Sequence, residues 1–517
     1  MNLERRLAPS LDRPPSWRHG GLRQPVHSAL RGYGWLLAAI VLGVALRCYR
    51  VGQNSLWIDE YMSLQSAVVP LSEIPAAAIR DHGNNPPIYF YLLHLAVGVH
   101  GSGEVTMRLI SVIAGILTIP FMWLLTLEIL PDPAAANITA LLVAANPILL
   151  WYSQEARPYA LLLLFCSAAL WCLAMALHTR RAGWWIAFTG CSTLAMLTHV
   201  FGVMPLLVGA LWCLFRLRDR RIIAGYVVAA ITALALSSGF LLQLTKSVMA
   251  QGTGGPHLPL TGMELPYTLF AFIAGYSFGP PLREIQELGA HVAILDYPVE
   301  TVLVGTTLAV LAWLILRLRS AAARDLVLLA VAPLALALGA AFFSTKAYNV
   351  RYGLPGLLGF LPLAGLALAS ASGSGRRLGP ALVLALFLWS DAQWFWARQY
   401  RKEDSRAAVA CMSRILRPGS TVAIAPGFMA GVLNHYVTQQ RDTLQIVGVD
   451  HPTELGKVPG AEALLLTRLH HVPDAAALRE AFLHAARPST SLSGVVGYHI
   501  YVADSAMNPA HSCSEGT

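Results

Sequence analysis

The sequence predicts an α-helical polytopic membrane protein with about eleven transmembrane helices and a C-terminal α/β domain. Of the 517 residues, 56% are hydrophobic and 13% are charged, and the mean hydropathy is +0.55. Soluble globular proteins carry about 25% charged residues, so this composition indicates a chain that crosses a bilayer many times. After residue 397 the long apolar runs give way to short segments of alternating character, which indicates a second domain.

The membrane domain is predicted from apolar runs of about the 20 residues that a helix needs to cross the hydrocarbon core. These runs lie at 33–51, 105–129, 134–152, 158–177, 183–200, 202–217, 221–243, 299–317, 325–343, 353–371 and 378–396. We therefore expect the transmembrane domain to cover residues 33–397.

Basic residues predict the orientation, because cytoplasmic loops carry an excess of Lys and Arg. The connections 178–181, 216–221, 317–324 and 375–377 are basic, and so is the Arg- and Pro-rich segment 1–32. An odd number of spans places all of them on one side, with 1–32 as a disordered cytoplasmic tail. The net charge of +9 is explained by these loops and does not indicate nucleic-acid binding.

The segment 86–101 is apolar but too short to span comfortably. If it crossed the membrane, every later basic loop would face outwards, so we interpret it as an interfacial helix. The outer face then carries the loop 52–104, the turn 151–159, the loop 244–298 and the turn 344–352.

Residues 398–517 are predicted to form a periplasmic α/β domain with a disordered end. The segments "STVAIAPG", "TLQIVGV", "EALLLTR" and "GYHIYVA" have the alternation of short strands. The segment "DAAALREAFLHAA" has the pattern of an amphipathic helix.

The stretch "SLWIDEYMSL" places two adjacent carboxylates, Asp59 and Glu60, directly after the first span. An acid at a helix end is usually a solvated interface residue, but Trp57, Ile58 and Tyr61 surround this pair with apolar groups. Desolvation raises the pKa of a carboxylate and makes it a better base. Asp59 and Glu60 are therefore candidate catalytic residues.

The other outer segments add polar and cationic side chains in an apolar frame. A single cation at such a place usually snorkels to lipid headgroups. Here several cationic and polar clusters share a face with a carboxylate pair. A carboxylate surrounded by cations suits a site that activates a hydroxyl while a phosphate leaves. The candidate substrate-binding residues are His82, Asn85, Tyr152, Gln154, Glu155, Arg157, His199, Lys346, Arg351 and Tyr352.

Four segments carry a resemblance to a known family: "LWIDEYMSL", "HGNNPPIYFYLLHL", "YSQEARPYALLL" and "RYGLPGLLGFLPLAGLAL", in this order. They resemble bacterial membrane glycosyltransferases of the GT-C fold. This family 39-like group includes protein O-mannosyltransferases, lipid A aminoarabinose transferases and rhizobial galacturonosyltransferases. The resemblance covers roughly residues 33–400 and is most specific at the Asp-Glu pair and at "SQEARPYAL". "HGNNPP" departs from the commoner His-Pro-Pro form, so the role of His82 is less well supported than that of Asn85.

The resemblance implies an inverting transferase in the bacterial inner membrane that takes a sugar from a polyprenyl-phosphate donor on the periplasmic side. Asp59 matches the family's catalytic acid and would deprotonate an acceptor hydroxyl, while Glu60 would orient the acceptor or Asp59. Arg157, Lys346 and Arg351 are candidates for stabilising the leaving phosphate. We expect no metal-binding residues and no cofactor, since the lipid-linked sugar is a substrate. A divalent ion, which some GT-C enzymes use, is left open.

Three other functions fit parts of the pattern. A transporter or flippase of envelope glycolipids would place charges mid-membrane, whereas those in the predicted spans lie near the ends, with Asp391 the nearest exception. An enzyme of the O-antigen-ligase type, which consumes a diphosphate-linked glycan, is a second alternative, but the early Asp-Glu pair argues against it. A membrane scaffold whose outer domain binds a partner would tolerate the loss of Asp59. The expected partners are the donor, membrane lipids and a periplasmic acceptor, which the sequence leaves open among lipid, polysaccharide and protein.

Overall fold

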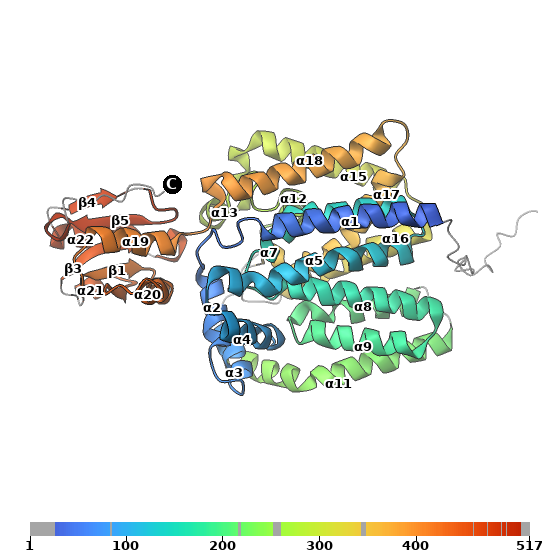
Figure 1. Cartoon of the computed structure of the whole chain (residues 1–517), viewed down its shortest axis with the longest axis horizontal. Helices are drawn as coiled ribbons and strands as arrows, with labels where there is room; N and C mark the ends of the chain where they lie inside the picture. The colour runs from blue at the N-terminus through green and yellow to red at the C-terminus, as the bar shows by residue number, and fades with distance from the viewer. Residues whose placement is uncertain are drawn as a thin grey trace, which may run out of the picture.

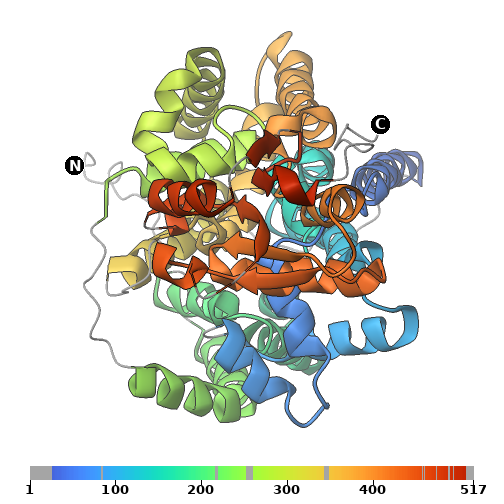
Figure 2. The same ribbon diagram turned by 90° about the vertical axis from the view of Figure 1, so that its left-hand side faces the viewer.

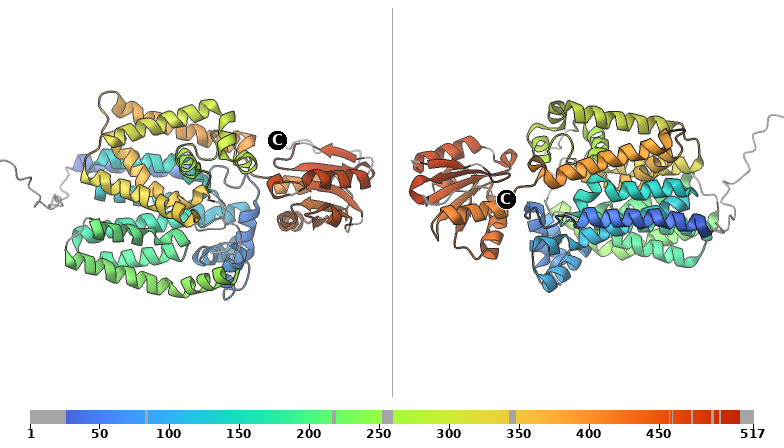
Figure 3. Two further views of the ribbon diagram at one scale, coloured as in Figure 1. Left: turned by 180° about the vertical axis from the view of Figure 1, so that it is seen from behind. Right: turned by 45° about the horizontal axis from the view of Figure 1, so that its top comes forward.

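The chain forms a bundle of long helices with an α/β domain at one end (Figure 1). In both views of Figure 3 this domain stands beyond the end of the bundle. The computed structural model describes residues 26–82, 85–215, 219–251, 260–342, 348–456, 458, 460–472, 474–486, 489–492 and 494–507.

The bundle contains a helix for every predicted span. Its helices are α1 (Val26–Cys48), α5 (Glu104–Ile129), α6 (Pro133–Ala145), α7 (Pro147–Ser153), α8 (Tyr159–Thr179), α9 (Ala182–Met196), α10 (Met204–Phe215), α11 (Arg220–Gln251), α12 (Glu264–Ala274), α15 (Pro298–Leu316), α16 (Ala321–Phe342), α17 (Leu357–Ala369) and α18 (Gly375–Trp396). In the described part of the chain, six helices are long and apolar enough to cross a membrane, or seven if the bent pair α6–α7 is one span. The helices α9, α10 and α17 are shorter, with 15, 12 and 13 residues.

The third predicted span is broken rather than continuous, because α6 and α7 meet at an angle of 52°. Pro147 has no N–H to donate and holds Asn146 in an extended conformation, which ends α6. Arg47 on α1 donates to the carbonyls of Val143 and Ala144 at 3.1 and 2.7 Å. The carbonyl groups that the break would leave without partners are thereby satisfied inside the bundle.

The segment between α1 and α5 stays at the end of the bundle that faces the α/β domain. It forms α2 (Ile58–Ala67), α3 (Ile74–His82) and α4 (Ile88–His100), which lie across that end (Figure 1). Figure 2 looks onto this end and shows the blue helices beside the orange and red domain. At 1.5 Å per residue, the 13 residues of α4 extend about 20 Å and do not cross the bilayer core.

The predicted outer loop 244–298 contains more structure than we expected. Besides α12, its described part holds the short helices α13 (Leu282–Leu288) and α14 (Ala290–Ala293). The helix α12 has 11 residues, most of them apolar, and packs against α7 and α15, so it belongs to the bundle but is too short to cross it.

The C-terminal domain is a mixed sheet with helices packed on it. The strands are β1 (Thr421–Ala425), β2 (Gln445–Gly448), β3 (Ala461–Leu466), β4 (Ser489–Leu492) and β5 (His499–Ala503), in the order β2-β1-β3-β5-β4. β1 pairs in parallel with β2 and β3, while β5 pairs antiparallel with β3 and β4. The helices are α19 (Ser405–Ile415), α20 (Ala430–Gln439), α21 (Pro452–Leu455) and α22 (Ala475–Ala485). The predicted α/β class is confirmed; β4, α19 and α20 were not anticipated.

Polar contacts fix the domain to the bundle. The Tyr436 hydroxyl donates to Glu104 Oε1 at 2.9 Å and accepts the backbone N–H of Leu56 at 2.7 Å. Arg406 forms an ion pair with the same Glu104 carboxylate at 3.0 Å. The domain therefore holds both the start of α5 and the segment that leads into α2.

Candidate active site

Asp59 lies in the first turn of α2, where it meets two cations from distant parts of the chain. Its Oδ2 accepts a hydrogen bond from Arg351 Nη1 at 3.2 Å, across 292 residues of sequence. Arg157 Nη1 donates to the backbone carbonyl of Asp59 at 3.4 Å. The side chains of Asp59 and Arg351 are 24% and 26% exposed, so the pair is within reach of a substrate.

Glu60, the next residue, is fully buried and has both carboxylate oxygens engaged. Arg108 contacts it through two nitrogens, at 2.8 and 2.7 Å, and the backbone N–H of Ala156 donates to it at 2.8 Å. A weaker bond from the Trp57 N–H, at 3.4 Å, closes the first turn of α2. Burial alone would raise the pKa of Glu60, but the charge and hydrogen bonds of Arg108 hold that pKa below its ordinary value.

The same guanidinium fixes the approach to α2. Arg108 also donates to the carbonyls of Val51, Asn54 and Ser55, at 2.7, 2.9 and 3.2 Å. Glu60 was expected to orient either the acceptor or Asp59. Its carboxylate is fully buried, which does not fit direct contact with an acceptor. Glu60 instead holds the segment that positions Asp59.

We expect Glu60→Gln to lower the free energy of unfolding by about 3–5 kcal/mol, because breaking a buried ion pair leaves Arg108 uncompensated. The thermal midpoint of the purified protein in detergent measures this loss. The matched control is Glu73→Gln, which removes an exposed carboxylate from the same outer segment and should leave the midpoint unchanged. Equal midpoints for the two variants would show that the ion pair adds no stability.

The depressed pKa gives this ion pair a pH signature. Since the folded pKa of Glu60 lies below its unfolded value, the stabilisation is present above the unfolded pKa and is lost as the pH falls through the folded pKa. On acidification the wild type should therefore approach the stability of Glu60→Gln, and the two melting curves should converge.

Aromatic rings surround the two arginines near Asp59. The guanidinium groups of Arg157 and Arg351 lie 5.9 and 5.8 Å from the centre of the Tyr159 ring, and Arg351 lies 5.7 Å from that of Tyr352. Tyr152 packs edge-on against Tyr159 at 5.0 Å. These faces attract the cations and keep them in place without neutralising their charge.

His199 closes another side of this aromatic cluster. Its ring is 5.3 Å from that of Tyr159 and stacks on Phe201 at 5.5 Å, and its Nδ1 accepts the N–H of Phe201 at 3.2 Å. Burial, with a further contribution from Arg157 and Arg351, lowers the pKa of His199 to about 3. The ring is therefore neutral at physiological pH and adds no competing charge.

Gln154, one of the predicted substrate-binding residues, has its side-chain amide engaged within the bundle. Its amide nitrogen donates to the carbonyls of Leu46, Arg47 and Tyr49, at 3.2, 3.0 and 2.8 Å, and its oxygen accepts from Trp394 at 2.9 Å. These contacts satisfy the C-terminal end of α1, where carbonyls lack helical partners. Gln154 therefore joins the end of α1 to α18, and its part in substrate binding stays a prediction.

Glu155 pairs with a residue that sequence reasoning missed. Its carboxylate is 2% exposed and lies 3.6 Å from Lys402 Nζ, which comes from the segment between α18 and α19. The Lys402 ammonium lies over the rings of Trp57 and Trp151, at 4.5 and 4.8 Å. Burial raises the pKa of Glu155; Lys402 opposes this, whereas Glu60 and Asp59 add to it.

The structure thus brings Asp59, Glu60 and the 151–159 and 348–352 segments to one place. Asn85 is buried directly ahead of α4, while Lys346 and the side chain of His82 lie outside the described residues. Sequence reasoning missed Arg108, Tyr159 and Lys402. Arg108 carried a usable signal, since a charge inside a predicted span is rarely without a role. The described residues contain no group of three or more His, Cys, Asp or Glu side chains that could hold a metal ion.

Comparison with known proteins identifies the fold. Residues 84–242 match the family model described as Dolichyl-phosphate-mannose-protein mannosyltransferase. ArnT from Cupriavidus metallidurans in the apo state has a TM-score of 0.59 at 15% identity, covering 93% of this chain and 100% of that chain. The same protein bound to undecaprenyl phosphate has a TM-score of 0.53 at 15% identity, covering 92% and 99%. The Archaeoglobus fulgidus oligosaccharyltransferase in the apo form has a TM-score of 0.50 at 13% identity, covering 88% and 72%. No curated protein matches the sequence.

Proposed function

We propose that this chain, a membrane glycosyltransferase of the GT-C fold, transfers a sugar from a polyprenyl-phosphate donor to an envelope acceptor at Asp59. The observation that carries the proposal is the partly exposed Asp59 carboxylate beside two cations, the partly exposed Arg351 and the buried Arg157. The acceptor hydroxyl needs a base, and the leaving phosphate needs a positive charge. This arrangement supplies both. The structure of ArnT with undecaprenyl phosphate supports a lipid-phosphate donor.

Asp59 acts as the general base in this proposal. It takes the proton from an acceptor hydroxyl, and the hydroxyl oxygen attacks the anomeric carbon of the donor. The bond between that carbon and the phosphate oxygen breaks, its electron pair leaves with the lipid phosphate, and the anomeric configuration inverts. A positioned base of this kind contributes about 10²–10⁴-fold to the rate.

Arg351 and Arg157 stabilise the charge that develops on the leaving phosphate. Donors aimed at developing charge in a site of low dielectric are usually the largest single contribution to catalysis. Arg351 pairs with Asp59 at 3.2 Å, and a phosphate that arrives beside its guanidinium would compete for the same N–H groups. Donor binding would then weaken the ion pair between Arg351 and Asp59 and leave the Asp59 carboxylate free to accept a proton.

We place this site on the periplasmic side of the bacterial inner membrane. The described parts of the basic connections lie at the end of the bundle away from the α/β domain, and cytoplasmic loops are the basic ones (Figure 1).

A reporter fused after Ala397 should therefore be periplasmic, and one fused after Arg220 should be cytoplasmic. Alkaline phosphatase, which is active only outside the cytoplasm, and a fluorescent protein that fails to mature there give opposite readouts. If both fusions report the same compartment, this orientation is wrong.

The proposed activity is tested with the purified full-length protein, polyprenyl-phosphate-linked sugars and envelope extract as the acceptor source. The expected result is release of polyprenyl phosphate together with a glycosylated envelope product. In proteoliposomes, a flippase would instead move the lipid-linked sugar between leaflets and leave its glycosidic bond intact. That outcome would replace the transferase proposal.

A further inference from the structure

The connection between α1 and α2, residues 49–57, leads directly into the turn that carries Asp59. Its backbone is irregular, so its buried N–H and carbonyl groups need partners from other segments. On the bundle side, Arg108 of α5 donates to three of its carbonyls. On the other side, the partners come from the C-terminal part of the chain.

Residues in and just ahead of α19 hold the connection from the side of the α/β domain. Arg406 Nη2 donates to the carbonyl of Gln53 at 2.7 Å. Ser55 Oγ donates to the carbonyl of Glu403 at 2.9 Å and accepts the backbone N–H of Ser405 at 3.0 Å. The connection is thus clamped between the bundle and the domain.

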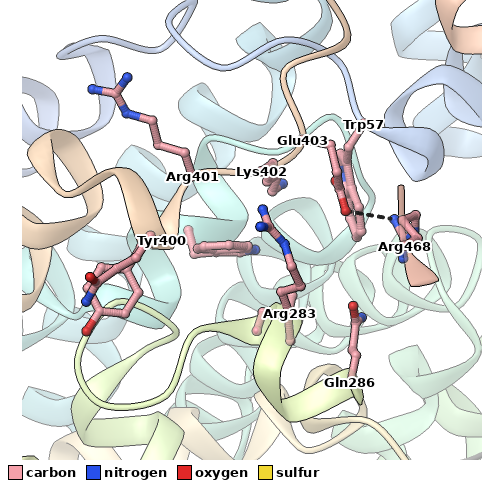
Figure 4. A pocket seen from close by; sticks show the side chains of 11 residues that line it. Trp57, Arg283, Gln286, Tyr400, Arg401, Lys402, Glu403 and Arg468 are labelled. Carbon is pink, nitrogen blue, oxygen red and sulfur yellow. Dashed lines mark ion pairs between the residues drawn. The ribbon is translucent and has the colours of Figure 1, made fainter. Parts of the chain in front are cut away.

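The indole ring of Trp57, at the end of the connection, is held from the same side. Figure 4 shows this ring beside Lys402, Glu403 and Arg468. Lys402 Nζ and the Arg468 guanidinium lie 4.5 and 5.6 Å from the centre of the ring, and Arg468 pairs with Glu403 at 3.8 Å. Trp57 directly precedes α2, so these contacts fix the start of the helix that carries Asp59.

Tyr436 of α20 links two parts of the framework around the base. Its fully buried hydroxyl accepts the N–H of Leu56 at 2.7 Å and donates to Glu104 Oε1 at 2.9 Å. Leu56 lies three residues ahead of Asp59, and Glu104 lies one helical turn ahead of Arg108 in α5. One hydroxyl of the domain therefore ties the connection to the helix that carries Arg108.

The start of α20 also packs directly on α2, at the side of the domain that faces this helix (Figure 1). A Cβ added at Gly431 would lie 2.7 Å from Cε1 of the Tyr61 ring, so glycine permits this close approach. The His435 ring lies 6.3 Å from the Tyr61 ring. Tyr61 follows Asp59 by two residues in α2, so the domain contacts the first turn of this helix as well as the connection ahead of it.

We infer that the docked C-terminal domain sets the position of the Asp59 carboxylate, with Tyr436 as the positioning residue. The inference rests on the proposed function and gives the domain a part in it. A general base must lie within hydrogen-bonding reach of the proton that it takes. A displacement of about 1 Å can cost about 10²-fold in rate. Because the Tyr436 hydroxyl is fully buried, it acts through the backbone of Leu56 and through α5 rather than by contact with a substrate.

The test compares kcat and donor KM of the purified full-length protein, with a polyprenyl-phosphate-linked sugar as donor and envelope extract as the acceptor source. Tyr436→Phe keeps the ring and removes the hydroxyl, and kcat should fall about 10-fold, as a small displacement of the base would cause. Donor KM should stay at the wild-type value, because Arg157 and Arg351 belong to other segments of the chain. The matched control is Tyr501→Phe in β5, whose ring packs into an apolar cluster formed within the domain, and its kcat should be that of the wild type.

The Asp59→Asn background separates positioning of the base from a merely structural role. No base remains to be positioned there, so adding Tyr436→Phe should lower kcat no further. A loss of the same size in both backgrounds would show that the hydroxyl acts independently of Asp59 and would overturn the inference. Wild-type kcat for Tyr436→Phe, or a loss confined to donor KM, would overturn it as well.

Ser55→Ala breaks a second contact between the connection and the domain and should give the same pattern with a smaller loss. If Tyr436→Phe does not fold, Ser55→Ala decides the question by the same comparisons. Near-wild-type turnover by Asp59→Asn would contradict the proposed function itself. Impaired Asp59→Asn beside fully active Tyr436→Phe would contradict only the positioning role, so the two failures give different results.

Discussion

Asp59→Asn should lower the rate of sugar transfer by about 10²–10⁴-fold while the protein stays folded. The substitution keeps the shape of the side chain and removes its ability to accept a proton. The first turn of α2 is held by Glu60, through Arg108 and the N–H groups of Ala156 and Trp57, so it does not depend on the Asp59 carboxylate. The measurement is turnover of the purified enzyme at saturating donor, with the thermal midpoint recorded for each variant.

The control for this prediction is Glu73→Gln, which neutralises an exposed acid on the same outer segment. It should turn over like the wild type, since Glu73 lies outside the cluster around Asp59. Near-wild-type turnover by a well-folded Asp59→Asn protein would rule out general-base catalysis by Asp59. A scaffold protein would also tolerate the change, so this result would reopen the non-enzymatic alternative.

Arg351→Ala should cost about 10²–10³-fold in turnover, the range observed when one donor to a developing oxyanion is removed. Arg351→Lys should be impaired less, because a lysine supplies the charge but not the planar pair of donors. The phosphate gains charge as the glycosidic bond breaks, so the loss should affect kcat as well as donor affinity. Steady-state kinetics with varied donor separates the two effects.

The competing explanation for Arg351 is that it only reaches towards lipid headgroups. In that case lysine would replace it freely and neither substitution would change kcat. Arg479→Ala, which removes an exposed arginine from α22, is the matched control and should be silent. We expect the same pattern, with a smaller loss, at Arg157, which contacts the Asp59 carbonyl rather than its carboxylate.

Much of the fold followed from the sequence because the bilayer imposes simple rules. A helix that faces lipid must be apolar along its length, so each apolar run of the sequence coincides with one or two helices of the bundle. The break at Pro147 and the short helix α12 were missed because they depend on partners elsewhere. Arg47 satisfies the carbonyls at the break, and α12 is buried against α7 and α15. Hydropathy averaged over about 20 residues does not show such local hydrogen bonds and packing contacts.

The candidate site was predictable only as a set of segments on one face. Arg351 and Asp59 are 292 residues apart, and nothing local in either segment specifies their contact. Gln154 belongs to a turn with a specific sequence, and nothing in that turn indicates that its amide donates to the carbonyls at the end of α1. Lys402 was missed because "YRKED" has the pattern of a solvated charge run, whereas the docked domain buries its ammonium between two tryptophans.

The most direct measurement is a cryo-electron microscopy structure of the Asp59→Asn variant with a polyprenyl-phosphate-linked sugar. Our account predicts that the donor phosphate lies within hydrogen-bonding distance of the Arg351 and Arg157 guanidinium groups. The anomeric carbon should face the substituted side chain, with the path of attack open on the side away from the phosphate. A donor phosphate bound away from both guanidinium groups, with its anomeric carbon out of reach of residue 59, would contradict the assignment of Asp59 as the base.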